Sequence, residues 1–438
     1  MRTIDPNRDW KMLLSHLPED YEQLAIQCRL FNPQWSNAKV TSFDWILRMI
    51  LLHVGADLPL RQTVACVAQG GGPSVSQVWL HQKMRRAEPY LATLVQRMVS
   101  RVGQEATPER WAGYEMVCLD GSTVSGPGAE GADARIHGVL RLHDLRVVSV
   151  HVTNEHEGET LRRFTWVPDE LVIVDRGYAN APGIAWVVDH GADVLVRVTR
   201  GSLPLFDEHD QCIDVLDWCR KLTGHRAHEC AAKVIEGQGR KRRHVAGRLI
   251  GFRLPDREAA EARERVRREQ GAHVTEEQLE AASYVILFTT APAERLSAAR
   301  CVEAYRLRWQ LELQWKRWKS LCHFDRVPNY RDDTIRSWLT AKVLLGLVLD
   351  KIGSASLASP QTDATSRPLA RQPWKLTAIL WPLIVSALIP IRLAEAATRL
   401  PDLVVHLDKL DHDAARHQVQ AFRDRFYTVV TQDAAANY

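Results

Sequence analysis

The sequence of 438 residues predicts an α/β fold, because segments with strand and helix patterns alternate through its centre. Five segments have the short, β-branched and apolar composition of strands: 115–122, 134–142, 147–154, 170–175 and 193–199. The fourth is a continuous apolar run, which is typical of a strand buried on both faces of a sheet. Helical patterns at 158–165 and 180–190 stand on either side of it. The predicted order is therefore β-β-β-α-β-α-β.

That order, followed later by a helix, is the order of an RNase H-like core, so we expect such a core with a β-rich insertion domain inside it. Strand patterns at 231–236, 248–254 and 284–289 and a charged helix at 257–269 belong to the insertion. The predicted parts are a helical N-terminal DNA-binding region (1–105), the first part of the core (106–200), the insertion (201–290), the part of the core with the catalytic helix (291–350), a linker (351–373) and a helical C-terminal region for possible dimerisation (374–438).

Composition places the chain among cytoplasmic proteins without assigning a function. The net charge of +4 is too small to identify a partner, and most of the cations are Arg, which suits phosphate contacts or reflects only codon bias. The eight Cys show no C-x-x-C spacing, so we expect reduced thiols and neither a zinc site nor disulfides. The apolar run 376–391 is shorter than the roughly 20 residues of a membrane span, and the N-terminus has no apolar signal core.

Residues 297–321 contain no Gly or Pro and predict one long helix that carries a stripe of reactive side chains. Tyr305, Arg308, Glu312 and Lys319 fall within roughly 60° of one another at about 100° per residue, and Lys316 borders them. One carboxylate among cations on a helix face suits a divalent metal beside phosphates. The stripe therefore indicates an active-site helix.

Two further carboxylates have the same potential role. Asp120 ends the first predicted strand and Asp175 ends the fourth, and each is followed closely by Gly. Each alone is more often ordinary turn chemistry. In an RNase H-like sheet these strands are neighbours and the late helix packs across them, so Asp120, Asp175 and Glu312 should converge. Three converging carboxylates need cations, and two Mg²⁺ ions, or Mn²⁺ in their place, are the natural partners.

The motif Tyr305-x₂-Arg308-x₃-Glu312-x₆-Lys319 matches the Y-R-E-K signature of the IS-four family of bacterial insertion-sequence DDE transposases, which includes the Tn-five type. The segment 119–123, with Asp120, resembles the first-aspartate region of that family, and 174–178 resembles its second. The resemblance implies that the three acids bind metal ions and that Tyr305, Arg308 and Lys319 contact DNA phosphates. It also implies strand nicking, a DNA hairpin, joining of 3′-hydroxyl ends to target DNA, and a homodimer that bridges two double-stranded ends.

Other candidate DNA contacts have a plain alternative. The helix 76–86 exposes Lys83, Arg85 and Arg86, either as part of a DNA-reading motif or as a solvated face. A basic hairpin tip either grips the DNA backbone or is solvated: Arg240, Lys241, Arg242 and Arg243. Tyr284 either stacks a flipped base, as an aromatic of the family does, or packs as a core residue.

Two other functions remain open. One is an RNase H-fold nuclease that cuts without strand transfer, and the other is a catalytically inactive DNA-binding regulator descended from a transposase. The complete Asp/Asp/Glu set disfavours the regulator. The cation-rich helix disfavours the simple nuclease.

Overall fold

The computed structural model describes residues 6–34, 39–104, 110–126, 134–154, 156–199, 201–237, 239–327, 332–358 and 373–390. The chain divides into two compact units. One comprises residues 1–98, 123–134 and 316–438, and the other comprises 99–122 and 135–315. The C-terminal region beyond residue 390 and residues 359–372 of the predicted linker lie outside the described residues. Within the described residues, no helix is both long and apolar enough to cross a membrane.

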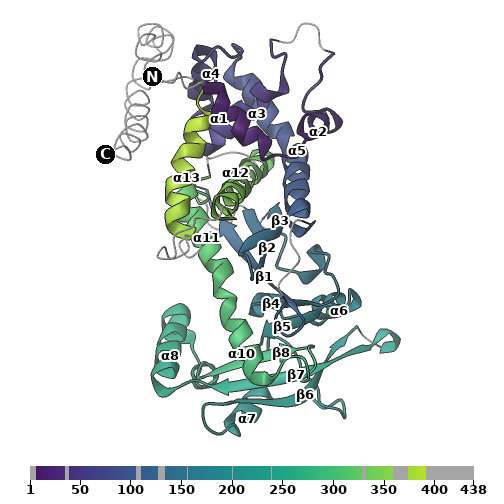
Figure 1. Cartoon of the computed structure of the whole chain (residues 1–438). Coiled ribbons are helices and arrows are strands. Elements are labelled where there is room, and N and C mark those ends of the chain that lie inside the picture. The colour runs from purple at the N-terminus through teal and green to yellow at the C-terminus, as the bar shows by residue number, and fades with distance from the viewer. Residues whose placement is uncertain are drawn as a thin grey trace. The chain divides into compact units, whose positions relative to one another are not determined.

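The second unit is built on one mixed sheet, which has eight strands among the described residues, in the order β3-β2-β1-β4-β5-β8-β7-β6 (Figure 1). The strands are β1 (Glu115–Val124), β2 (Ala134–Arg141), β3 (Arg146–Asn154), β4 (Glu170–Val174), β5 (Asp193–Arg197), β6 (Ala227–Glu236), β7 (Arg243–Arg253) and β8 (Tyr284–Thr289). Strand β4 pairs in parallel with β1 and β5. Strands β6, β7 and β8 pair antiparallel, and β8 joins them to β5. The strands expected in the insertion therefore extend the central sheet.

The connections between the strands of this unit contain the helices α6 (Ala181–Asp189), α7 (Val215–Arg220), α8 (Asp256–Gln270) and α9 (Glu276–Ala281). Helix α10 (Ala298–Leu307) and the start of α11 (Trp309–Cys322) follow β8. Helix α6 begins where the side chain of Asn180 accepts a hydrogen bond from the Gly183 N–H (2.8 Å), an N-cap that satisfies one free backbone donor. The helix predicted over 158–165 is reduced to one 3₁₀ turn, η1 (Leu161–Arg163).

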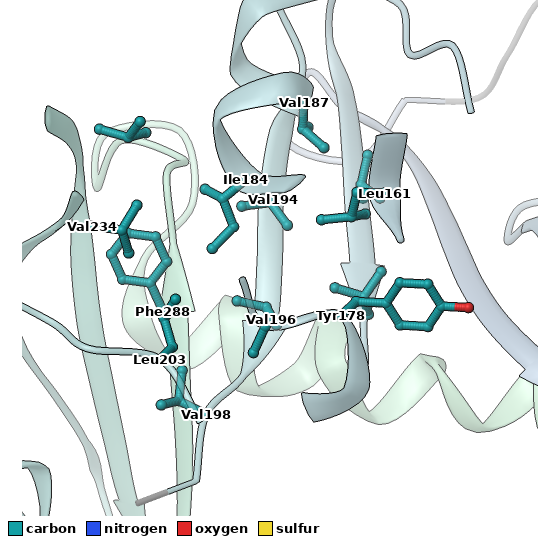
Figure 2. Packing of buried hydrophobic residues seen from close by; sticks show 14 of the residues in the cluster. Leu161, Tyr178, Ile184, Val187, Val194, Val196, Val198, Leu203, Val234 and Phe288 are labelled. Carbon is teal, nitrogen blue, oxygen red and sulfur yellow. The ribbon is translucent and has the colours of Figure 1, made fainter. Parts of the chain in front are cut away.

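An apolar cluster holds one face of the sheet together (Figure 2). Alternate residues of neighbouring strands supply it, including Val117 and Leu119 of β1 and Val172 and Val174 of β4. Phe288 of β8, completely buried, brings the added strands into the same cluster. Burying such side chains contributes about 1.5–3 kcal/mol each. The core therefore fixes the part of β1 that carries Asp120 and the end of β4, which Asp175 follows.

The first unit is helical and joins both ends of the described chain. Its helices are α1 (Pro6–Ser15), α2 (Tyr21–Gln27), α3 (Phe43–Gly55), α4 (Leu60–Gln69), most of α5 (Gln77–Gln104), α12 (Asp332–Ala358) and α13 (Pro373–Leu388). Arg48 of α3 is 1% exposed, and its guanidinium donates to the carbonyls of Ala387, Leu388 and Ile389. These are carbonyls at the end of α13 that lack partners within the helix. The N-terminal helices thus cap a C-terminal helix.

Two sequence predictions in this unit are wrong in detail. The helix expected at 76–86 does not end there but is the start of a longer helix, α5, which runs to Gln104 with Pro89 inside it. Its inner side chains Ala87, Tyr90, Leu91 and Leu94 are fully buried, and this packing overrides the helix-breaking tendency of proline. Helix α12 also continues to Ala358, through the first eight residues of the predicted linker.

Candidate active site

The register of two parallel strands places Asp120 beside Asp175. Strand β1 pairs with β4 from Glu115↔Glu170 to Leu119↔Val174, and the two aspartates are the next residue on each strand. Neighbouring strands lie about 4.8 Å apart. The expectation that these aspartates come together is thus supported by backbone pairing.

The two aspartates differ in their local backbone. Asp175, predicted to end the fourth strand, instead directly follows β4. It caps the 3₁₀ turn η2 (Arg176–Tyr178), where its Oδ1 accepts from the Arg176 N–H at 2.6 Å. Asp120 does not end its strand, because β1 continues to Val124. Its Oδ1 accepts from the Gly121 N–H at 2.9 Å. Each carboxylate thus leaves its other oxygen for the site.

The predicted single helix over 297–321 is two helices that meet at Arg308. Helix α10 ends at Leu307 and α11 begins at Trp309, and Arg308 keeps right-handed helical angles (φ −52°, ψ −31°). Two hydrogen bonds of the tighter 3₁₀ type hold the junction, from Arg308 N to Tyr305 O and from Leu311 N to Arg308 O, both 3.1 Å. Glu312 therefore lies in the first turn of a new helix.

Arg308 connects the carboxylates of two elements. Its Nη1 lies 3.8 Å from Asp120 Oδ2, and its Nη2 donates to Glu312 Oε1. The Arg308 side chain is only 13% exposed, and those of Asp120 and Glu312 are 17% and 26% exposed. Charge pairs shielded to this degree are stronger than surface pairs. The guanidinium therefore bridges Glu312 and Asp120.

The electrostatics show that the three acids share one environment. Burial raises the pKa of the Asp120 carboxyl to about 7, and the charges of Asp175 and Glu312 act in the same direction. Arg308 and the Gly121 N–H oppose that rise. Burial alone would lower the pKa of Arg308, but Tyr305, Asp175, Glu312 and Asp120 together raise it above its ordinary value. The three acids and Arg308 thus interact electrostatically at one place.

Tyr305 also lies at this cluster. Its ring is 5.8 Å from the guanidinium carbon of Arg308, and within the described residues its buried hydroxyl has no hydrogen-bond partner. Burial, and then the charge of Asp175, raise the pKa of Tyr305 to about 12. A buried hydroxyl without a partner is costly unless a ligand or water completes it.

The two lysines of the motif belong to the part of α11 in the helical unit. Lys319 donates from Nζ to the backbone carbonyl of Thr123 at 2.8 Å, and Lys316 is exposed.

The remaining DNA-contact candidates occupy varied surroundings. Lys83 is half-buried and donates to the Leu30 carbonyl at 2.7 Å, whereas Arg85 and Arg86 are exposed on α5. Arg243 forms a bidentate pair with Asp189 (2.6 and 2.8 Å).

In the same hairpin, Arg242 lies 3.5 Å from Asp210, and Lys241 is exposed. The side chain of Arg240 is outside the described residues. Tyr284 begins β8 and packs, half-buried, against the apolar cluster.

Sequence reasoning did not single out Glu159, which precedes η1. Its carboxylate lies beside Gly121 and Gly177, close to both aspartates in the fold. No spacing rule joins Glu159 to either motif, and only the fold shows its position.

The donor set suits hard divalent ions, because Asp120, Asp175 and Glu312 offer carboxylate oxygens from three elements. The arrangement as it stands is held by Arg308. Among the residues that the structure describes, no three acidic, histidine or cysteine side chains are already arranged round a metal position. The negative charges of Asp175 and Glu312 act together on Asp120, and added positive charge would offset their repulsion. The carboxylate oxygens and negative charge of these three residues thus fit Mg²⁺ or Mn²⁺, provided that the Arg308 guanidinium moves away from Asp120 and Glu312.

Known proteins match the chain over most of its length. The family described as the transposase DDE domain matches residues 111–347, more than half of the chain. The transposase InsL of insertion sequence element IS186A from Escherichia coli K12 is 28% identical over 364 residues, and the transposase of element IS421 from Escherichia coli is 28% identical over 365. Each alignment covers 82% of this chain and 97% of the relative.

Among solved structures, the piggyBac transposase in a synaptic complex with hairpin DNA aligns at a TM-score of 0.45 and 11% identity, covering 92% of this chain and 86% of that one. The family match and the two bacterial relatives agree with the Y-R-E-K signature. The chain therefore belongs to the DDE transposases of bacterial insertion sequences, enzymes that cleave and transfer DNA strands.

Proposed function

We propose that this transposase moves its element by a cut-and-paste route in which Asp120, Asp175 and Glu312 hold two divalent ions. The observation that carries the proposal is the parallel register of β1 and β4, together with the Arg308 contacts that bring Glu312 to the same point. When bound, the ions would activate a water or 3′-hydroxyl and stabilise the leaving oxygen.

The other side chains of the site have roles at the DNA phosphates. Arg308 and Tyr305 lie beside the carboxylates and present a guanidinium and an unpartnered hydroxyl to a phosphate of the cleaved end. Lys319 would also contact a phosphate of the cleaved end, and Lys316, Arg85, Arg86 and the basic hairpin would contact other phosphates of the DNA backbone. Nicking, hairpin formation, hairpin opening and end joining are all phosphoryl transfers, so one site serves each of them.

The fold supports this assignment. The strand order β3-β2-β1-β4-β5, with β1, β4 and β5 parallel, is the order expected of an RNase H-like core. We infer that β6 and β7 are the insertion of this family, built onto the sheet through β8. A homodimer on paired DNA ends in the bacterial cytoplasm completes the proposal. The mass of a complex with two end duplexes, measured by light scattering, tests the dimer.

The test uses duplexes that carry the inverted repeats flanking the gene, one strand labelled, with a supercoiled target plasmid and Mg²⁺. We expect nicked, hairpin and joined products on denaturing gels. Asp120→Asn, Asp175→Asn and Glu312→Gln should each abolish all three products while leaving end binding measurable. Glu303→Gln, at an exposed acid of α10, is the matched control and should remain active.

The outcome separates the alternatives. Cleavage without joined product identifies a nuclease, and end binding without any cleavage identifies a regulator. Joined product without a hairpin retains the transposase but removes the hairpin route. Full activity of any of the three acid variants removes the proposed active site.

A further inference from the structure

Glu159 lies between the segments that follow the two aspartates. An added Cβ at Gly121 would be 3.3 Å from Glu159 Oε1, and one at Gly177 would overlap with Glu159 Oε2. Gly121 directly follows Asp120, and Gly177 comes two residues after Asp175. The absence of a side chain at both positions thus admits one carboxylate between them.

Two fully buried polar side chains point to the same place. The Cβ position at Gly121 is also 3.3 Å from His137 Nδ1 and 3.5 Å from the Tyr178 hydroxyl. Both atoms lack a hydrogen-bond partner within the described part of the chain, although His137 Nε2 is bonded to Thr153 Oγ1 at 3.0 Å. Figure 2 shows the Tyr178 hydroxyl pointing away from the apolar cluster that holds its ring. Buried polar atoms without partners usually mark a place that a water or ligand completes.

Glu159 is only partly compensated. The positive charge of Arg135 stabilises its carboxylate, whereas burial and repulsion by Asp175 both destabilise it. Burying this carboxylate is therefore unfavourable unless a further cation offsets the cost. A divalent cation beside Asp175 would remove both penalties.

We propose, on the basis of the proposed function, that Glu159 is a fourth carboxylate of the divalent-ion site, with His137 and Tyr178 binding the water that completes its coordination. The three groups stand where two glycines open the backbone beside Asp120 and Asp175. The inference concerns ion binding, so it is testable without DNA or turnover.

The experiment measures Mn²⁺ binding to the full-length protein, from the electron paramagnetic resonance signal of free Mn²⁺. Glu159→Gln should weaken binding about 10-fold or more, the range found for groups that support metal ligands. Gly177→Ala should have a similar effect, because its methyl group displaces the Glu159 carboxylate. The double variant should be no weaker than the worse single one, since both remove the same interaction.

Glu157→Gln is the matched control, because Glu157 is in the same loop but 48% exposed and paired with Arg163 at 3.6 Å. It should bind Mn²⁺ as the wild type does, and circular dichroism melts check that every variant folds. Wild-type affinity in Glu159→Gln, with binding lost in Asp120→Asn, overturns the role of Glu159 and leaves the proposed function intact. Unchanged affinity in Asp120→Asn and Asp175→Asn as well overturns the proposed function itself. Equal losses in Glu157→Gln and Glu159→Gln also overturn the role of Glu159.

Discussion

Gly138 on β2 supports the helix that carries Glu312. A Cβ added at Gly138 would lie 2.6 Å from Cη2 and 2.7 Å from Cζ2 of Trp315, which is 5% exposed. Trp315 follows Glu312 by three residues on α11, so both move with the same helical turn. Gly138→Ala should therefore push this turn away from the sheet.

The expected size follows from the overlap. Ordinary contact begins at 3.4 Å, so the indole and its helix must retreat by several tenths of an ångström. Overpacking of this kind lowers the free energy of unfolding by about 1–3 kcal/mol, and replacing Gly by Ala in a strand raises it by roughly 0.5–1 kcal/mol. A net loss of up to about 2.5 kcal/mol in the free energy of unfolding is expected. Misplacement of a catalytic group by about 1 Å lowers rates about 100-fold, so a 10- to 100-fold slower cleavage is expected here.

Single-turnover cleavage of labelled end DNA, together with urea denaturation, measures both effects. Gly158→Ala is the control, because nothing lies within 4 Å of its Cβ position. Trp315→Phe should make room, so that Gly138→Ala costs less in its presence. A coupling energy near zero in this double-mutant cycle, or wild-type cleavage by Gly138→Ala, would refute the argument that this contact sets the position of Glu312.

Three further predictions concern charges. Burial lowers the pKa of His53 to about 4, so between pH 6.5 and 4 the imidazole is protonated in the unfolded chain but not in the folded one. The free energy of unfolding should therefore decrease by up to about 3 kcal/mol as the pH falls through that range, and urea titrations of His53→Gln should show a weaker pH dependence. Arg48→Met should lower the free energy of unfolding by about 3–5 kcal/mol, because the carbonyls at the end of α13 lose their hydrogen-bond donor. Arg97→Met, at a residue that is 59% exposed, should lower it by less than about 0.5 kcal/mol in the same assay. Arg308→Met should lower the free energy of unfolding by about 2–4 kcal/mol in metal-free buffer, because it removes the cation between Asp120 and Glu312. Mg²⁺ should raise the melting temperature of this variant more than that of the wild type; equal increases would contradict the idea that Arg308 and the ions compensate the same acids.

The central strands could be predicted from sequence because their patterns have a direct physical cause. The run ending at Val174 is apolar throughout since β4 has a paired strand on each side and is buried on both faces. The position of Asp175 after that run followed at once. Its pairing with Asp120 needed only the assumption that β1 and β4 are neighbours.

Tertiary contacts limited the prediction elsewhere. The junction between α10 and α11 at Arg308 contains neither Gly nor Pro. It is formed by hydrogen bonds of the 3₁₀ type, which leave no signal in the sequence. A proline normally breaks or bends a helix, yet burial of the neighbouring side chains keeps α5 continuous through Pro89. Lys83 is exposed by helical spacing alone, but the carbonyl of Leu30, 53 residues away, accepts its ammonium hydrogen bond.

The position of Arg308 reconciles two roles that sequence reasoning kept apart. The motif suggests a phosphate contact, whereas the fold pairs the guanidinium with Asp120 and Glu312. Converging carboxylates without a cation would repel one another, so the folded protein needs this pairing before any ion binds. Ions held by the acids would take over that compensation and release the guanidinium toward a phosphate within its reach. We propose that Arg308 stabilises the site in the free enzyme and contacts DNA once the acids hold their ions.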